Sequence, residues 1–111
     1  AVTYHSAFAY MFRRFGIQLL GVIEPQPGKE PSSADIAMLV QKMRQRSVNV
    51  VFAEPQFSRK AADAVAGELG AKVVMLDPIG NPSDPDRDTY ISLMRYNLDA
   101  ILSALSRQPV Q

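Results

Sequence analysis

The stretch "VTYHSAFAYMFRRFG", residues 2–16, joins a predicted strand directly to a predicted helix and contains the only histidine of the chain. Residues 2–4 are β-branched or aromatic, which is typical of a short strand. From Ser6 onward, apolar residues recur at the i, i+3, i+4, i+7 spacing of one buried helical face, namely Phe8, Met11, Phe12 and Phe15. His5 lies at the junction. The stretch therefore predicts one strand–helix unit with a histidine at the carboxyl end of its strand.

The same alternation recurs three more times along the chain. Apolar runs of strand length stand at 17–24, 48–53 and 71–76, and each is followed by a connection that contains proline. Proline continues neither a central strand nor a helix, so each connection marks the end of a strand. The run at 48–53 is rich in β-branched residues, as expected of a strand covered on both faces.

Three further amphipathic helices are predicted after these runs. The first begins with a capping box in which Asp35 stands three residues after Ser32. The second is predicted to be capped by Ser58 and closed by Gly70. The third covers about 89–105. The residues expected to be buried are, in order, Ile36, Leu39, Val40 and Met43; Ala62, Val65, Ala66 and Leu69; and Ile91, Met94, Leu98, Ile101, Leu102 and Leu105.

Alternating short apolar strands and amphipathic helices define the fold class. Four successive strand–helix units imply right-handed crossovers and an α/β domain, in which a four-stranded parallel sheet has helices on both faces. The 111 residues suit one domain, so residues 1–111 are predicted to form a single α/β domain. The tail at 106–111 has nothing to pack against and is expected to fray.

The composition excludes several classes of function. A net charge of +1 with no basic tract gives no electrostatic case for nucleic acid. No apolar run approaches the roughly 18 residues that a membrane span requires. The chain has no cysteine, which removes disulfides, thiolate metal sites and cysteine nucleophiles. It also lacks the glycine-rich phosphate-binding motifs, the G-x-S-x-G elbow and the H-E-x-x-H of metalloproteases.

Each predicted strand is followed by an ionisable residue. These residues are His5, Glu24, Glu54 and Asp77, and in an open parallel sheet ligands bind beyond the carboxyl ends of the strands. Imidazole and carboxylate donors suit zinc, manganese or ferrous iron. Structural roles also fit: a solvated histidine, a loop charge for Glu24, an acceptor for helix N-termini for Glu54, and a turn residue for Asp77.

Three segments of the sequence resemble those of a known protein family. "YHSAFAYMFRRFGI", "FAEPQF" and "LDPIG", in this order and spacing, are similar to the C-terminal lobe of the solute-binding proteins of zinc and manganese ABC importers, in their ZnuA-like, zinc-type branch. The resemblance covers 2–105. In that family a metal ion is held between two α/β lobes joined by a long helix, and the N-terminal lobe supplies two histidines.

The resemblance implies a role for three of the strand-end residues. By motif, His5 takes the place of the third metal ligand and Asp77 that of the usual fourth, while Glu54 is a candidate for orienting the ligating imidazole from outside. Members of the manganese type carry glutamate where this chain has His5. The histidine therefore favours Zn²⁺ over Mn²⁺, as nitrogen donors generally do.

The 111 residues do not include the first lobe of that family, its two histidines or the connecting helix. We expect a piece that folds but binds zinc weakly, because two ligands do not close a tetrahedral site. The expected role is delivery of zinc to a membrane permease, in the periplasm or at the cell surface. The expected partners are the metal ion, the missing lobe and the permease. A homodimer is one arrangement that would cover the exposed cleft surface.

Two other functions remain open on the sequence alone. The chain would act as a small metal-dependent hydrolase of flavodoxin-like architecture if Glu54 served as a general base for a metal-bound water. It would act as an interaction domain without a ligand if His5 had no metal to bind. A hydrolase would need a further histidine and a substrate-recognition motif, and the sequence has neither. We therefore expect a binding protein and not an enzyme.

Overall fold

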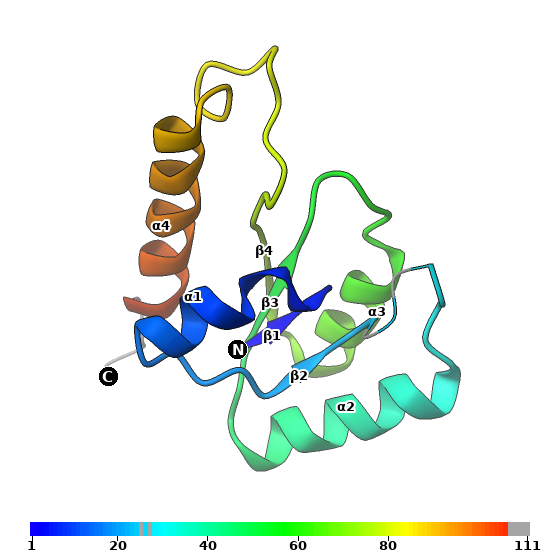
Figure 1. Ribbon diagram of the computed structural model, residues 1–111. Coiled ribbons are helices and arrows are strands. Elements are labelled where there is room, and N and C mark those ends of the chain that lie inside the picture. The colour runs from blue at the N-terminus through cyan, green and yellow to red at the C-terminus, as the bar shows by residue number, and fades with distance from the viewer. Residues whose placement is uncertain (25, 27, 107–111) are drawn as a thin grey trace.

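The computed structural model describes residues 1–24, 26 and 28–106. Its centre is a sheet of four strands, all parallel, in the spatial order β2-β1-β3-β4 (Figure 1). The strands are β1 (Val2–Thr3), β2 (Gly21–Val22), β3 (Val50–Ala53) and β4 (Lys72–Met75). The predicted parallel α/β class is confirmed, although the 17–24 run contributes only two residues to the sheet, as one of its two edge strands.

A helical segment follows each strand, as predicted. After β1 a single 3₁₀ turn, η1 (Ser6–Phe8), runs directly into α1 (Ala9–Arg14). The later helices are α2 (Ser33–Gln45), α3 (Lys60–Leu69) and α4 (Tyr90–Ser106). No helix within 1–24, 26 and 28–106 is both long and apolar enough to cross a bilayer.

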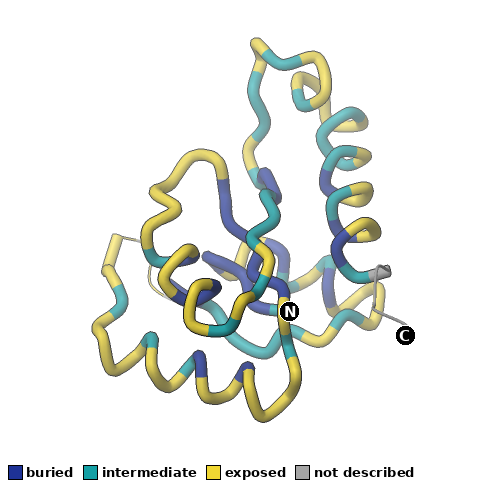
Figure 2. The backbone as a smooth tube through the Cα atoms, turned by 180° about the vertical axis from the view of Figure 1, so that it is seen from behind, coloured by how far each residue is buried: buried dark blue, intermediate teal, exposed yellow. Residues whose placement is uncertain are grey.

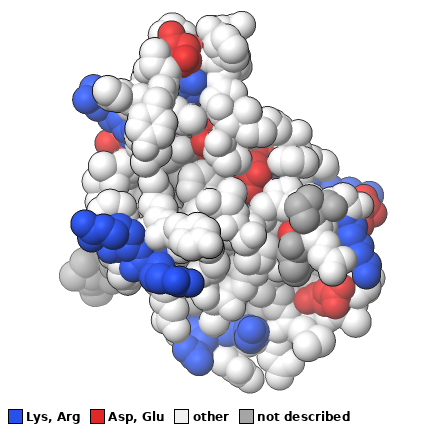
Figure 3. Space-filling view, viewed as in Figure 1, with Lys and Arg blue, Asp and Glu red and all other residues white. Residues whose placement is uncertain are grey.

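The helices form two layers, one on each face of the sheet (Figure 1). Successive residues of a strand point to opposite faces. In β3, accordingly, Val51 packs in the core beneath α2 and α3, while Phe52 packs against α1 and α4. The buried strand positions are those of the two central strands, β1 and β3, and Figure 2 shows further buried positions on the inner sides of the helices. On the face seen in Figure 3, acidic and basic side chains are interspersed.

Most of the predicted helix boundaries are confirmed. The Ser32 hydroxyl accepts a hydrogen bond from the Asp35 N–H, and the Asp35 carboxylate accepts one from the Ser32 N–H, both at 3.1 Å. Gly70 ends α3 with a φ of +63°, the left-handed conformation that glycine adopts without strain. α3 begins at Lys60 with Arg59 at its N-cap position, and the predicted capping residue Ser58, one residue earlier, accepts a hydrogen bond from the Lys60 N–H at 3.1 Å.

Two predicted buried faces are partly wrong. Phe15 is 62% exposed, because α1 ends at Arg14 and the next residue no longer follows the helical face. In α4, Ile101 is buried but Ile91, Leu98 and Leu102 are exposed. A helix of 17 residues is about 25 Å long and the four-residue strand β4 about 13 Å, so much of α4 lies beyond the strand beside it. Of the tail predicted to fray, 107–111 lies outside the described residues.

Candidate metal centre

The four strand-end residues lie along one edge of the sheet, in the order of the strands that carry them. Glu24 follows β2, His5 follows β1, Glu54 follows β3 and Asp77 follows β4. All four are buried, with exposed fractions of 5%, 8%, 3% and 0%. This burial argues against two of the structural alternatives, a solvated histidine at position 5 and a simple loop charge at Glu24. Parallel strands share a carboxyl edge, and this is why residues so far apart in sequence meet here.

His5 lies between two carboxylates because β1 lies between β2 and β3. Its Nε2 atom is 3.0 Å from Oε1 of Glu24, and its Nδ1 atom is 3.2 Å from Oε1 of Glu54. The backbone N–H of His5 also donates to Oε2 of Glu54 at 3.2 Å. The Glu24 N–H donates to the Tyr4 carbonyl at 2.8 Å, which extends the backbone ladder past the strands and fixes the level of Glu24 beside His5.

These carboxylates change the protonation of the imidazole. Burial lowers the pKa of His5, but the hydrogen bonds and charges of Glu24 and Glu54 outweigh it, and the net pKa is raised. The hydrogen bond from His5 is the largest of the effects that lower the pKa of Glu24. The two carboxylates favour a positive charge between them, which the protonated imidazole of His5 supplies when no metal ion is bound. A divalent cation bound to the imidazole would supply that positive charge instead of the proton.

Two aromatic rings surround the imidazole. The ring of Tyr4 lies edge-on to His5 at 4.7 Å between centroids, and the ring of Phe57 lies edge-on at 4.6 Å. The Tyr4 hydroxyl donates to Oε2 of Glu24 at 3.2 Å, so the same side chain that flanks His5 also holds its carboxylate partner. Phe57 is itself 42% exposed and screens the imidazole from solvent.

Asp77 lies two strands from His5 and is held by its own set of donors. Its Oδ1 atom accepts three hydrogen bonds, from the side-chain amide of Gln56 at 2.7 Å and from the N–H groups of Ile79 and Gly80 at 2.9 Å. Its Oδ2 atom accepts one from Arg87 at 2.7 Å. The bonds to Ile79 and Gly80 are those of the turn residue that the sequence left open as an alternative.

These contacts keep Asp77 ionised despite its complete burial. Burial alone raises the pKa of Asp77, but the N–H groups of Gly80 and Ile79, the amide of Gln56 and the guanidinium of Arg87 together lower it below its usual value. The structure thus presents a buried, charged carboxylate that already has a cationic partner.

Besides Gln56, Asp77 is positioned by two residues that no motif in the sequence singles out. One is Arg87. The other is Asn97 of α4, whose Oδ1 atom accepts from the Asp77 N–H and whose Nδ2 atom donates to the Asp77 carbonyl, both at 2.8 Å. Asn97 is 2% exposed. Its signal in the sequence was an amide on the apolar side of the last helix, three residues after Met94 and four before Ile101.

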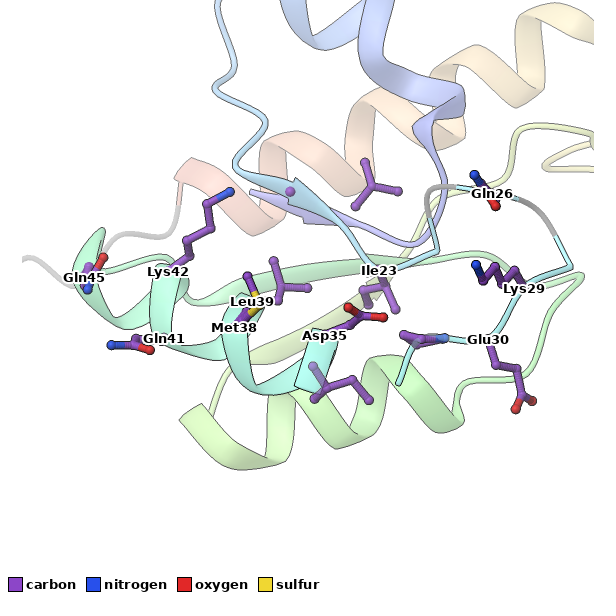
Figure 4. A pocket seen from close by; sticks show the side chains of 14 residues that line it. Ile23, Gln26, Lys29, Glu30, Asp35, Met38, Leu39, Gln41, Lys42 and Gln45 are labelled. Carbon is purple, nitrogen blue, oxygen red and sulfur yellow. The ribbon is translucent and has the colours of Figure 1, made fainter. Parts of the chain in front are cut away.

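Two hollows on the molecule differ in their relation to this edge. A groove of about 700 Å³ lies between β2 and α2 (Figure 4) and contains none of the four strand-end side chains. A second hollow of similar volume lies between α1, the β4–α4 loop and α4, and Asp77, Arg87 and Asn97 contribute to its wall. Only the second hollow therefore includes one of the strand-end residues, Asp77.

The donors at this edge suit a transition-metal ion but do not complete a site. Imidazole nitrogen and carboxylate oxygen are ligands that zinc accepts. Within the part of the chain that the structure describes, no group of three His, Asp or Glu side chains is arranged to hold a metal ion. Further ligands from outside these residues are needed to close a tetrahedral shell.

Comparison with known proteins identifies relatives of the chain. High-affinity zinc uptake system protein ZnuA of Bacillus subtilis is 34% identical over 107 residues, which are 94% of this chain and 34% of that protein. ZnuA of Brucella suis is 31% identical over 106 residues, 96% of this chain and 32% of that protein.

Solved structures and the family profile agree with these relatives. The solute-binding protein FpvC of Pseudomonas aeruginosa, in complex with Ni²⁺, superposes with a TM-score of 0.81 at 28% identity, over 99% of this chain and 40% of that one. The chain thus spans about a third of the length of the curated relatives. The profile of the family described as zinc-uptake complex component A, periplasmic, matches residues 1–104, and the chain belongs to this family.

Proposed function

We propose that the chain is the C-terminal lobe of an extracytoplasmic solute-binding protein, which captures a zinc ion and passes it to the membrane permease of an ABC importer. One observation carries the proposal: the only imidazole of the chain is buried at the carboxyl edge of the sheet, with a carboxylate beside each ring nitrogen. The relatives, named as zinc uptake proteins, support zinc as the ion.

In this proposal His5 donates Nε2 to the ion. Glu54 accepts a hydrogen bond from Nδ1–H, which fixes the ring and leaves the lone pair of Nε2 for the metal, as carboxylates do around many zinc sites. Asp77 is the second donor of this lobe. Its Oδ2 atom has Arg87 as its partner, and a carboxylate oxygen has two lone pairs, so one stays available for a metal ion.

The proposed activity is binding and release, with no covalent step. Zinc prefers four ligands, so two donors from this lobe require the remainder from a second lobe, and the chain alone is expected to bind weakly. The hydrolase alternative is disfavoured by the placement of Glu54, because Oε1 and Oε2 both face His5 instead of a substrate. Self-association of the chain through this surface would bring two such half-sites together and would be detected by gel filtration.

The test is a calorimetric titration of the 111-residue chain with zinc, accompanied by gel filtration. We expect weak binding of one ion per chain, lost in His5→Ala and kept in Glu68→Gln, a control for an exposed carboxylate on α3. Self-association on zinc binding would give one ion per two chains and a larger hydrodynamic radius. Binding that is unchanged in His5→Ala would refute the assignment of His5.

A further inference from the structure

We propose that Glu24 is a ligand of the same metal ion as His5, so that the ends of β1 and β2 together present a preformed imidazole–carboxylate pair. The inference rests on the role proposed for His5 and sets Glu24, a residue that neither the sequence resemblance nor the relatives assign, against Asp77 as the second donor of this lobe, since two ligands from each lobe fill a tetrahedral shell. The carboxyl end of β2, an outer strand of the sheet, then becomes part of the metal-binding surface of the lobe.

The distance between the two donors is close to what a single ion requires. Zinc binds imidazole nitrogen at about 2.0–2.1 Å and carboxylate oxygen at about 2.0–2.2 Å. Two such bonds at a tetrahedral angle place the donors about 3.4 Å apart. Nε2 of His5 and Oε1 of Glu24 are 3.0 Å apart, so a separation of about 0.4 Å more would admit the ion between them.

Glu24 is held in place by contacts that do not depend on the metal. Oε2 accepts a hydrogen bond from the Tyr4 hydroxyl at 3.2 Å, and Oε1 accepts one from the Gly28 N–H at 2.9 Å. Gly28 has a φ of +86°, a conformation that is costly for other residues, and it turns its N–H toward the carboxylate. Ligating carboxylates are commonly supported by hydrogen bonds of this kind.

Glu24 also differs from Asp77 in what an entering ion has to displace. The carboxylate of Asp77 carries a short ion pair with Arg87 and three further hydrogen bonds. Among the ion pairs of the described residues, Glu24 takes part only in the one with His5. An ion that enters between His5 and Glu24 therefore separates only the two groups that then bind it.

A purely structural Glu24 would orient His5 from outside the metal shell, and the test distinguishes the two roles. Zinc affinity is measured by calorimetry for the chain, Glu24→Gln and Glu24→Asp, with Glu68→Gln as the exposed control and thermal melts to verify folding. Glutamine keeps an acceptor for the Gly28 N–H but binds metal poorly. Aspartate keeps the charge but withdraws the oxygens by one methylene. We expect both substitutions to weaken zinc binding by more than about 100-fold, because the loss of a carboxylate outside the metal shell already costs about 10–100-fold. A loss within that smaller range would assign Glu24 to the outer role and overturn the inference.

Each outcome decides the matter. Affinity unchanged in Glu24→Gln would show that the carboxylate is not a ligand, and affinity kept in Glu24→Asp would show that its charge alone matters; either result overturns the inference while leaving His5 as a ligand. Zinc binding unaffected by His5→Ala would overturn the proposed function as well. If the Glu24 variants melt below the assay temperature, Tyr4→Phe replaces them: it removes one support of Glu24, and severalfold weaker binding is expected, whereas unchanged binding refutes the inference.

Discussion

Replacing Asn97 by alanine removes both hydrogen bonds that tie the backbone of Asp77 to α4. The Asp77 N–H and carbonyl are buried, and each loses a partner at 2.8 Å. An unsatisfied buried polar group costs about 1–3 kcal/mol, so the loss of two partners in Asn97→Ala is expected to lower the free energy of unfolding by about 2–6 kcal/mol. For a chain of about this length, 1 kcal/mol shifts the midpoint by about 4–8 °C, and the melting temperature should fall by at least about 8 °C.

The assay is urea denaturation followed by circular dichroism, with a thermal melt as a second measure. Asn49→Ala is the matched control, because Asn49 is exposed just before β3, and a surface change of this kind costs at most about 0.5 kcal/mol. A loss in Asn97→Ala no larger than that of the control would refute the argument that Asn97 supports the Asp77 turn.

Three further predictions concern pH and backbone conformation. Zinc affinity should fall about tenfold per pH unit below the pKa of His5, because one proton competes with the ion. The fall should begin above about pH 6.5, because Glu24 and Glu54 raise that pKa. A zinc affinity that is independent of pH between about 5.5 and 8 would contradict this. In the metal-free chain the pH dependence is opposite: protonated His5 stabilises the fold below about pH 6.5, and this stabilisation is lost as the pH rises through the raised pKa of His5. In urea titrations the destabilisation caused by His5→Ala should therefore become smaller toward about pH 8. A destabilisation that grows with pH would contradict this. In thermal melts Gly67→Ala should stabilise α3 by about 0.5–1 kcal/mol. Gly70→Ala should destabilise it by about 1 kcal/mol, because Gly70 has a φ of +63°. Effects of the same sign in both variants would contradict the cap at Gly70.

The fold could be predicted because local signals agree along the whole chain. Apolar spacing gives the helices, and proline marks the end of each strand. The errors fall where tertiary contact decides. Phe15 fits the helical spacing but follows the last residue of α1, and Leu98 fits it but lies on a side of α4 that the sheet does not cover. Spacing alone does not state how far a helix runs past its sheet.

The candidate site could be predicted only in part. A parallel sheet places the carboxyl ends of all its strands on one side, and this brings His5 into contact with Glu24 and Glu54. The strand order β2-β1-β3-β4 decides which carboxylates flank the imidazole, and no short-range signal encodes it. Arg87 and Asn97 form hydrogen bonds with Asp77 because the β4–α4 loop brings them beside it, and composition does not reveal the path of that loop.

The most direct test of the central claim uses the fact that the chain has one histidine. Long-range ¹H–¹⁵N NMR spectra of the imidazole report its two nitrogens separately, so a zinc titration shows which of them the ion contacts. We predict that the Nε2 signal shifts to a metal-bound position and that Nδ1 stays protonated and hydrogen-bonded to Glu54. Zinc binding that leaves both nitrogen signals of His5 unchanged would contradict the account.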